Sequence, residues 1–276
     1  MISVDGVDAL APEHGRLFAV VGVFDGLHRG HLYLLEQLRA AAARRDATPA
    51  VITFDHHPDE ILRGAAPPLL CDPGERLKRL AAEGVGLTVI QRFDDATRRT
   101  TYDAFVRRIA ERVDLAGFLM TPDAAFGFER AGTPEKVSAL GHELGYEVVV
   151  VPALLVNGRR VSSSDVRMAI ERGDLREAER LLGRPYTVVG RRDATAVSDP
   201  EPGGVAADNS GGRAADDAGV RLDFAMPFAL PPVGEYRVRV AVVGTPHEVG
   251  ATLRLNGGAA IQGPVPAADA YAVTFW

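Results

Sequence analysis

The stretch that decides the fold is Val21–His31, VGVFDGLHRGH, in which two histidines stand three residues apart among three glycines. The apolar run Arg16–Phe24, RLFAVVGVF, leads into it, and leucines at helical spacing follow it in His31–Arg45. A continuous apolar run rich in valine predicts a strand buried on both faces, as in a parallel sheet. The stretch is therefore predicted to join a strand to a helix, and ligands of open α/β sheets bind at such junctions.

The same alternation of strand and helix continues along the chain. Further strands are predicted at Thr48–Phe54, Leu87–Gln91, Gly117–Thr121 and Glu147–Pro152, and helices at Pro73–Glu83, Thr101–Val113 and Pro134–Leu144. This order indicates βαβ units and a parallel sheet, and so an α/β domain. Two short helices are predicted within Ser164–Gly183, and Ser164 is expected to cap the first of them.

The character of the sequence changes after Tyr186. The segment Asp193–Gly219 is rich in Ala, Gly, Asp and Pro and is predicted to be a linker or a long loop. Alternating patterns then appear at Glu235–Val243, Ala251–Asn256 and Ala270–Trp276, which predict antiparallel strands. We therefore expect two domains, an α/β domain over residues 1–186 and a small β domain over residues 187–276.

Composition limits the class of protein. The formal net charge of −6 argues against a nucleic-acid or anionic-membrane partner. The single cysteine, Cys71, cannot form an internal disulfide, which favours a reducing cytoplasm. The first residues lack the pattern of a signal peptide, and no apolar run approaches the roughly 20 residues of a membrane span. We expect a cytoplasmic protein, and the sequence leaves its oligomeric state open.

The two histidines suit phosphate chemistry. A helix start offers unpaired N–H groups and a positive dipole end, and Gly30 allows the backbone to approach a ligand. His28 and His31 can donate ring N–H bonds to phosphate oxygens and so stabilise charge in a transition state. One histidine at a helix start is more often a cap or a surface residue, but two at this spacing favour the phosphate interpretation. The dinucleotide pattern G-x-G-x-x-G is absent.

These residues resemble a known signature. GVFDGLHRGH resembles the G-x-F-D-G-x-H-x-G-H motif of nucleotidylyltransferases, and more narrowly the adenylyltransferase module of prokaryotic FAD synthetases, the bifunctional riboflavin kinase/FMN adenylyltransferases. The stretches VITFDHHP, FGFERAG, VSSSDVR and GDLREAERLLGRPY follow in the order of that family. The resemblance implies a Rossmann-like nucleotidylyltransferase domain with a parallel sheet, followed by a small antiparallel β-barrel-like domain.

The resemblance also implies residue roles. Gly22, Phe24, Asp25 and Gly30 would form the ATP site with Ser163 and Ser164; His28, His31 and Arg167 would hold its phosphates; and His57, Asp123 and Arg130 would bind FMN. The residues themselves support the phosphate group, because a serine and an arginine one turn apart at a helix start converge on one anion. The plainer alternatives are a cap with a solvated arginine for Ser164 and Arg167, a turn residue for Asp123, and a capped loop for His57.

The implied reaction is ATP plus FMN giving FAD and pyrophosphate, with Mg²⁺ entering with ATP and no protein residue expected to bind the metal. Two departures from the family keep alternatives open. Ala125 stands where the family usually has arginine or another polar residue, so the acceptor could be a flavin analogue or another phosphorylated molecule. The P-T-A-N motif of the kinase module is absent, so we expect no riboflavin kinase activity. A flavin- or nucleotide-binding regulator without catalysis is the third possibility.

Overall fold

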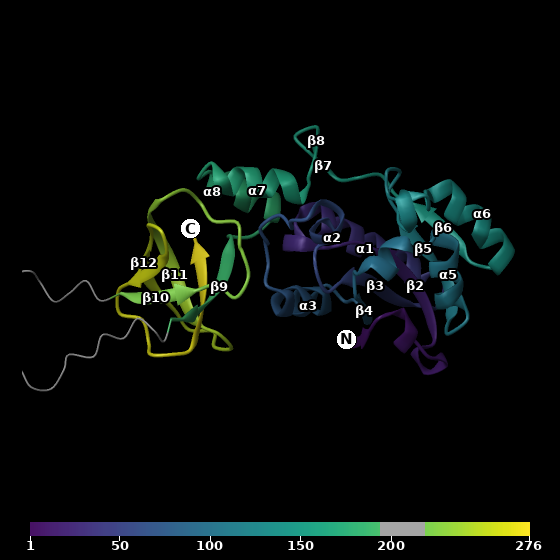
Figure 1. The fold of residues 1–276 in the computed structure, drawn as a ribbon, viewed down its shortest axis with the longest axis horizontal. Coiled ribbons are helices and arrows are strands. Elements are labelled where there is room, and N and C mark those ends of the chain that lie inside the picture. The colour runs from purple at the N-terminus through teal and green to yellow at the C-terminus, as the bar shows by residue number, and fades with distance from the viewer. Residues whose placement is uncertain (194–218) are drawn as a thin grey trace, which may run out of the picture. The chain divides into compact units, whose positions relative to one another are not determined.

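The computed structural model describes residues 1–193 and 219–276 (Figure 1). Almost all of the expected linker, Asp193–Gly219, lies outside these residues. The described chain divides into two compact units, Met1–Val166 and Arg167–Trp276. The division falls within helix α7, Ser163–Glu171, and the expected domain boundary after Tyr186 stays a prediction.

The first unit is built on a parallel sheet of six strands, in the order β1-β4-β3-β2-β5-β6. These strands are β1 (Ile2–Asp5), β2 (Arg16–Val21), β3 (Thr48–Phe54), β4 (Leu87–Gln91), β5 (Asp114–Met120) and β6 (Glu147–Val150). Every neighbouring pair in this sheet is parallel. The predicted α/β class is confirmed, because each crossover between parallel strands carries helical structure.

Helices cover both faces of the sheet. They are α1 (Arg29–Ala43), α2 (Asp59–Arg63), α3 (Pro73–Ala82), α4 (Asp95–Arg99), α5 (Tyr102–Ala110) and α6 (Pro134–Leu144), with 3₁₀ turns η1 (Val7–Ala9), η2 (Pro12–His14), η3 (Asp25–Leu27) and η4 (Phe128–Arg130). Alternate residues of β2 face different cores: Leu17 joins the cluster of α5 and α6, and Phe18 joins that of α1 and α3. This alternation explains the uninterrupted apolar run, since both faces of the strand are buried.

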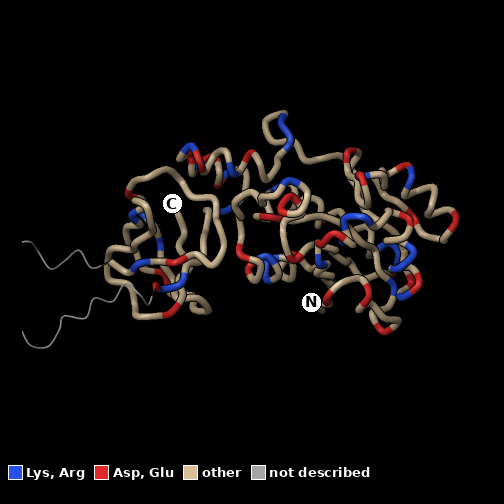
Figure 2. The backbone as a smooth tube through the Cα atoms, in the orientation of Figure 1, with Lys and Arg blue, Asp and Glu red and all other residues tan. Residues whose placement is uncertain are grey.

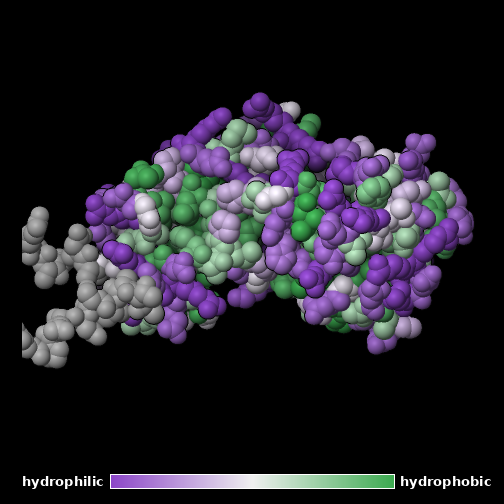
Figure 3. Space-filling model, viewed as in Figure 1, coloured by the Kyte–Doolittle hydropathy of each residue, from purple (hydrophilic) through white to green (hydrophobic). Residues whose placement is uncertain are grey.

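The second unit contains a closed antiparallel barrel, in the order β10-β13-β12-β11-β14-β9. Its strands are β9 (Thr187–Arg192), β10 (Val220–Asp223), β11 (Gly234–Val242), β12 (Glu248–Leu255), β13 (Ala259–Gln262) and β14 (Ala270–Phe275), and α7 and α8 (Leu175–Leu182) precede them. Inward residues such as Val238, Leu253 and Tyr271 are at most 1% exposed and fill the barrel. Hydrophobic residues also show on its visible side in Figure 3. The expected β-barrel-like domain is confirmed.

Several predicted elements have different ends: β5 begins at Asp114 instead of Gly117, β6 ends at Val150 instead of Pro152, and α5 ends at Ala110 instead of Val113. The strand expected over Arg16–Phe24 stops at Val21, because Phe24 and Leu27 adopt left-handed backbone with φ of 53° and 39°. A short antiparallel hairpin, β7 (Leu155–Val156) and β8 (Arg159–Arg160), was not predicted. Within residues 1–193 and 219–276, no helix has both the length and the apolar character needed to cross a bilayer.

Candidate nucleotide-binding site

The junction loop, residues 22–28, leaves the carboxyl end of β2 and enters α1. Phe24 is buried in a left-handed conformation, which costs a non-glycine residue roughly 1–2 kcal/mol. Surrounding contacts offset that strain. Thr53 donates its hydroxyl to the Val23 carbonyl at 3.0 Å, and the buried Asp25 carboxylate accepts the Leu70 N–H at 3.0 and 3.2 Å. The loop is therefore held in one unusual shape by residues distant in sequence.

His28 ends the junction loop and caps α1. Its Nδ1 accepts the backbone N–H of His31 at 3.3 Å, and its ring stacks on that of His31 with centroids 3.7 Å apart. Because Nδ1 accepts, the neutral ring carries its proton on Nε2. The capping role and a donor role toward phosphate use different ring nitrogens, so the two interpretations of His28 are compatible.

The Nδ1 atom of His31 is buried and could accept or donate a hydrogen bond to a bound ligand. Its Nδ1 has no hydrogen-bond partner among the described residues. Burial lowers the pKa of His31 well below its usual value, and electrostatic interactions with His28 and Arg160 lower it further. His31 is therefore neutral near pH 7. A buried nitrogen without a partner is costly, and a bound polar molecule or water would satisfy it.

The residue between the two histidines must be small. A Cβ on Gly30 would lie 3.1 Å from the His28 ring and 3.2 Å from the Val161 carbonyl oxygen. Next to Val161, the Ser163 hydroxyl donates to the backbone carbonyl of Asp25 at 3.1 Å. The start of α7 and the junction loop therefore lie together, as the expected ATP site requires.

The cap of α7 is Ser162, and the expectation for Ser164 is wrong. The Asp165 N–H donates to the Ser162 hydroxyl at 3.2 Å, and the Ser162 N–H donates to the Asp165 carboxylate at 3.2 Å. This reciprocal pair is a capping box. Ser164 lies exposed inside the first turn, because the helix already begins at Ser163. Arg167 is buried, follows Ser163 by four residues on the same helix and belongs to the second unit.

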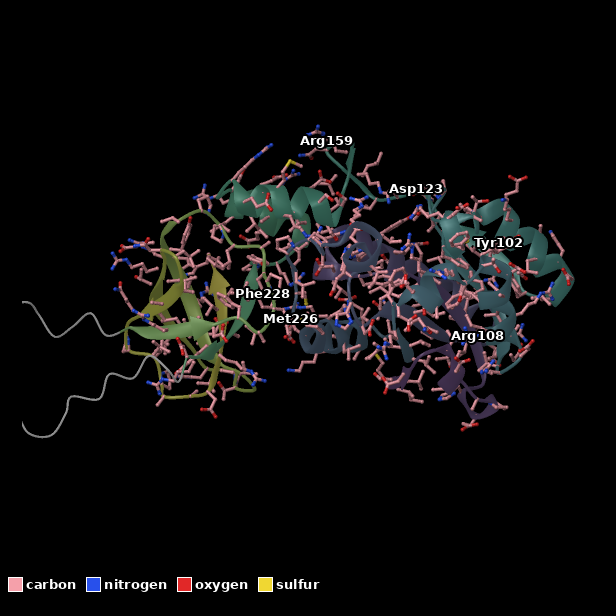
Figure 4. The ribbon with its side chains drawn as sticks, viewed as in Figure 1. Tyr102, Arg108, Asp123, Arg159, Met226 and Phe228 are labelled. Atoms are coloured by element: carbon pink, nitrogen blue, oxygen red, sulfur yellow. The ribbon has the colours of Figure 1, made fainter. Side chains whose placement is uncertain are left out.

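Asp123 lies just after β5 and forms an ion pair with Arg160 of the β7–β8 hairpin. Its carboxylate also accepts the Thr121 hydroxyl at 2.9 Å, and Arg160 holds the pKa of Asp123 below its usual range. Arg130 donates to the Asp123 carbonyl at 3.3 Å. Basic residues lie on strand β8 of the hairpin in Figure 2, and in Figure 4 Arg159 points outward, away from Asp123.

Arg160 was missed in the sequence. Its guanidinium binds Asp123 and is close enough to His31 to lower the pKa of that ring. Arg160 therefore interacts both with Asp123, which is expected to bind FMN, and with His31, which is expected to bind ATP. Its signal was available, because Arg159 and Arg160 stand directly before VSSSDVR and after Asn157-Gly158, a dipeptide typical of a hairpin turn.

The other expected FMN residues lie in two segments. His57 follows β3, and its Nδ1 accepts the Asp59 N–H at 3.2 Å, so the capped-loop alternative describes this nitrogen. The stretch FGFERAG folds against the start of α5, where Figure 4 labels Tyr102. A Cβ on Gly127, whose φ is 77°, would lie 2.5 Å from the Tyr102 backbone nitrogen, so this packing requires glycine. The roles of His57 and Arg130 in binding FMN stay predictions.

Sequence comparison decides the family. The family model of FAD synthetase matches residues 11–165. The chain belongs to the FAD synthetase family. The match contains the junction loop, both histidines and the α7 start up to Asp165.

Individual relatives of this FAD synthetase family member agree. It is 32% identical over 189 residues to the bifunctional riboflavin kinase/FMN adenylyltransferase of Pseudomonas fluorescens, covering 68% of this chain and 61% of that protein. The protein of that name from Escherichia coli K12 is 32% identical over 183 residues, 66% of this chain and 58% of that one. The chain thus matches about three-fifths of these relatives' length.

A solved structure shares the whole fold of this FAD synthetase family chain. The crystal structure of a macrolide-efflux protein from Streptococcus pneumoniae has a TM-score of 0.79 and covers 100% of this chain and 98% of its own. The two sequences are 21% identical, so the similarity concerns the fold alone.

Among the described residues of this FAD synthetase family protein, no three His, Cys, Asp or Glu side chains are grouped so that they could hold a metal ion. Two carboxylates among the expected site residues take part in other contacts: Asp25 accepts the Leu70 N–H, and Asp123 pairs with Arg160.

The lowered pKa of His31 predicts a pH-dependent stability. Its pKa is lowered on folding, so the unfolded chain binds more protons, and the free energy of unfolding falls as pH drops below about 6.5. The slope from this group is at most about 1.4 kcal/mol per pH unit. We expect His31→Asn to flatten the loss of melting temperature between pH 7.5 and 5.5, measured by calorimetry.

The exposed His142 on α6 provides the control for this measurement. His142→Asn should leave the pH dependence of the wild type unchanged. An equal slope in the wild type and in His31→Asn would show that His31 is not buried in its neutral form.

Proposed function

We propose that this protein is an FMN adenylyltransferase, which transfers the adenylyl group of ATP to FMN and releases pyrophosphate. The observation that carries the proposal is the stacked pair of His28 and His31 at the start of α1, with a buried His31 nitrogen that lacks a partner. Membership of the FAD synthetase family supports the choice of substrates.

The chemistry follows from how the junction loop holds these rings. An FMN phosphate oxygen attacks the α-phosphorus of ATP, the bond to the bridging oxygen breaks, and pyrophosphate leaves with the electron pair. No side chain becomes covalently bound. The N–H groups at the start of α1 and the Nε2 donor of His28 face developing negative charge, and their fixed positions avoid reorganisation during the reaction. Mg²⁺ enters with ATP and neutralises its phosphates.

The molecule that accepts the adenylyl group could be FMN or a related compound. Asp123, tied to Arg160 and to Arg130, supports a polar acceptor site beside the histidines. Ala125 supplies no polar atom where the family usually has one, which favours weaker or altered flavin recognition. A regulator that binds without reacting is the third candidate, and the presence of His28, His31 and Arg167 at the expected positions favours catalysis instead.

One assay separates the three candidates. Purified protein is incubated with Mg²⁺-ATP and FMN, and the products are identified by chromatography. FAD and pyrophosphate in equal amounts support the proposal. Adenylylation of a flavin analogue in preference to FMN would support the altered acceptor, and tight binding of FMN or ATP without any product would support the regulator.

We also predict that the protein does not phosphorylate riboflavin. A kinase needs a phosphate-binding loop, a metal beside the γ-phosphate and a base near the hydroxyl. In the C-terminal part of the sequence, the acids that could hold a metal or act as a base are Asp216, Asp217, Asp223 and Glu235. The first two lie outside the described residues. Asp223 ends β10, and Glu235 lies on β11 with its carboxylate 3.9 Å from Arg254.

The measurement is FMN formed from riboflavin and Mg²⁺-ATP, compared with a sample without protein. We expect no difference between the two. Protein-dependent FMN that disappears in Asp223→Asn or Glu235→Gln would contradict the prediction and assign the kinase step to the barrel.

A further inference from the structure

The proposed mechanism gives no role to Arg76, a buried arginine of the first unit. Arg76 lies on α3 with 8% of its surface exposed. Its Nη1 donates to the Val23 carbonyl at 3.1 Å, and its Nη2 donates to the Phe54 carbonyl at 2.9 Å. Both acceptors are backbone groups at the carboxyl ends of β2 and β3, which are neighbours in the sheet.

The two carbonyls belong to the two segments expected to bind the substrates. Val23 directly precedes the left-handed Phe24 in the junction loop. Phe54 ends β3 and is followed by Asp55, His56 and His57. A planar guanidinium fixes its two donors in one geometry. Arg76 therefore sets the distance between the junction loop and the segment that carries His57.

The Val23 carbonyl is held from two sides. The buried Thr53 donates its hydroxyl to the same oxygen at 3.0 Å. Two donors on one carbonyl fix the peptide plane between Val23 and Phe24, which is where the backbone turns into its left-handed conformation. Holding this plane orients the loop that ends at His28.

Keeping a guanidinium here is costly. Burial lowers the pKa of Arg76, and the Asp25 carboxylate opposes that effect. Its Nε is buried and has no hydrogen-bond partner within the described residues. Its two donors are given to backbone carbonyls and not to a carboxylate, so what the buried guanidinium contributes here is the fixed placement of those two carbonyls.

We propose that Arg76 is a positioning residue, which aligns the junction loop with the segment after β3 so that both substrates meet in reacting geometry. The substrates in this statement rest on the proposed function, whereas the alignment rests on the two hydrogen bonds alone.

The test compares Arg76→Met and Arg76→Lys with a matched control. Arg79→Met removes a second arginine from the same helix, one that pairs with Glu75 at 2.7 Å. Misplacing reacting groups by about 1 Å costs about 10²-fold in rate. We expect kcat/KM for FAD formation to fall about 10²-fold in Arg76→Met, with KM raised for both ATP and FMN. Arg76→Lys, which lacks the fork, should recover only part, and Arg79→Met should stay near the wild type.

Hydrogen exchange separates positioning from stability. In Arg76→Met and Arg76→Lys we expect faster amide exchange in residues 21–28 and 54–58, and unchanged exchange in α6. If Arg76→Met does not fold, Thr53→Val, which removes the second donor to Val23, takes the same test and should accelerate exchange in residues 21–28 only.

Two results would overturn the inference: exchange in residues 21–28 equal to the wild type in folded Arg76→Lys, or unchanged kcat/KM in folded Arg76→Met. Failure of the proposed function looks different. In that case the wild type itself makes no FAD, and the exchange measurements still decide whether Arg76 holds the loop.

Discussion

His31→Ala is expected to lower the rate of FAD formation about 10²–10³-fold while the protein remains folded. The ring lies at the start of α1, stacked on His28, and its buried Nδ1 has no partner in the described structure. Removing the ring removes a preorganised polar group and also relieves an unsatisfied buried atom. Activity and stability should therefore change in different directions, which steady-state kinetics and thermal unfolding measure together.

His28 allows the capping role to be separated from the catalytic role. His28→Ala should lower the rate by a similar factor and also cost about 1 kcal/mol of stability, because the cap on His31 N–H is lost. His28→Asn keeps an acceptor for that N–H, so it should regain the stability and not the rate. If His28→Asn restores turnover, His28 acts only as a cap and the proposed donor role is wrong.

Long regular elements were predictable from local sequence. The bounds of β3, β4 and α6 agree with those expected from the apolar runs and the helical pattern. Helix α6 shows why: Thr133 caps it, Pro134 begins it, and Gly145 ends it in a left-handed conformation. Each of these signals acts within a few residues of the helix end, so the sequence displays them directly.

The shape of the site depends on contacts that no local pattern displays. The junction loop is fixed by Leu70 and Arg76, which are 45 and 53 residues away from their partners Asp25 and Val23. The motif predicted which residues would gather there. The left-handed Phe24 that ends β2 early is stabilised by donors distant in sequence, which include Thr53 as well as Leu70 and Arg76. The capping box of α7 was local and was missed because three consecutive serines offered more than one start.

The short strands of the barrel were harder to predict, because they too depend on partners distant in sequence. Strands β11 and β12 alternate over eight or more residues, whereas β10 and β13 have four residues each. A four-residue strand carries too little alternation to be distinguished from a loop. Closure of the barrel pairs these short strands with longer ones, so their conformation comes from partners far along the chain.

Arg160→Ala is expected to lower kcat/KM for ATP about 10- to 100-fold, the effect of losing one charge-assisted contact. The positive charge of Arg160 lowers the pKa of His31. In the structure, Arg160 forms an ion pair with the exposed carboxylate of Asp123. A triphosphate arriving beside His31 carries more negative charge than one carboxylate and would compete for the guanidinium. The same substitution should raise the pKa of His31 toward its ordinary value, since a nearby positive charge disfavours the imidazolium.

The neighbouring Arg159 supplies the matched control, because it carries the same charge on the same strand but points outward in Figure 4. Arg159→Ala should leave both kcat/KM and the NMR titration of His31 unchanged. Asp123→Asn separates the partners further: it keeps an oxygen for Arg160 but removes the carboxylate charge, so affinity for ATP should be retained or improved while KM for FMN changes. Equal losses in Arg159→Ala and Arg160→Ala would mean that the hairpin attracts nucleotide only through its overall charge, and that the contact between Arg160 and Asp123 has no part in organising the site.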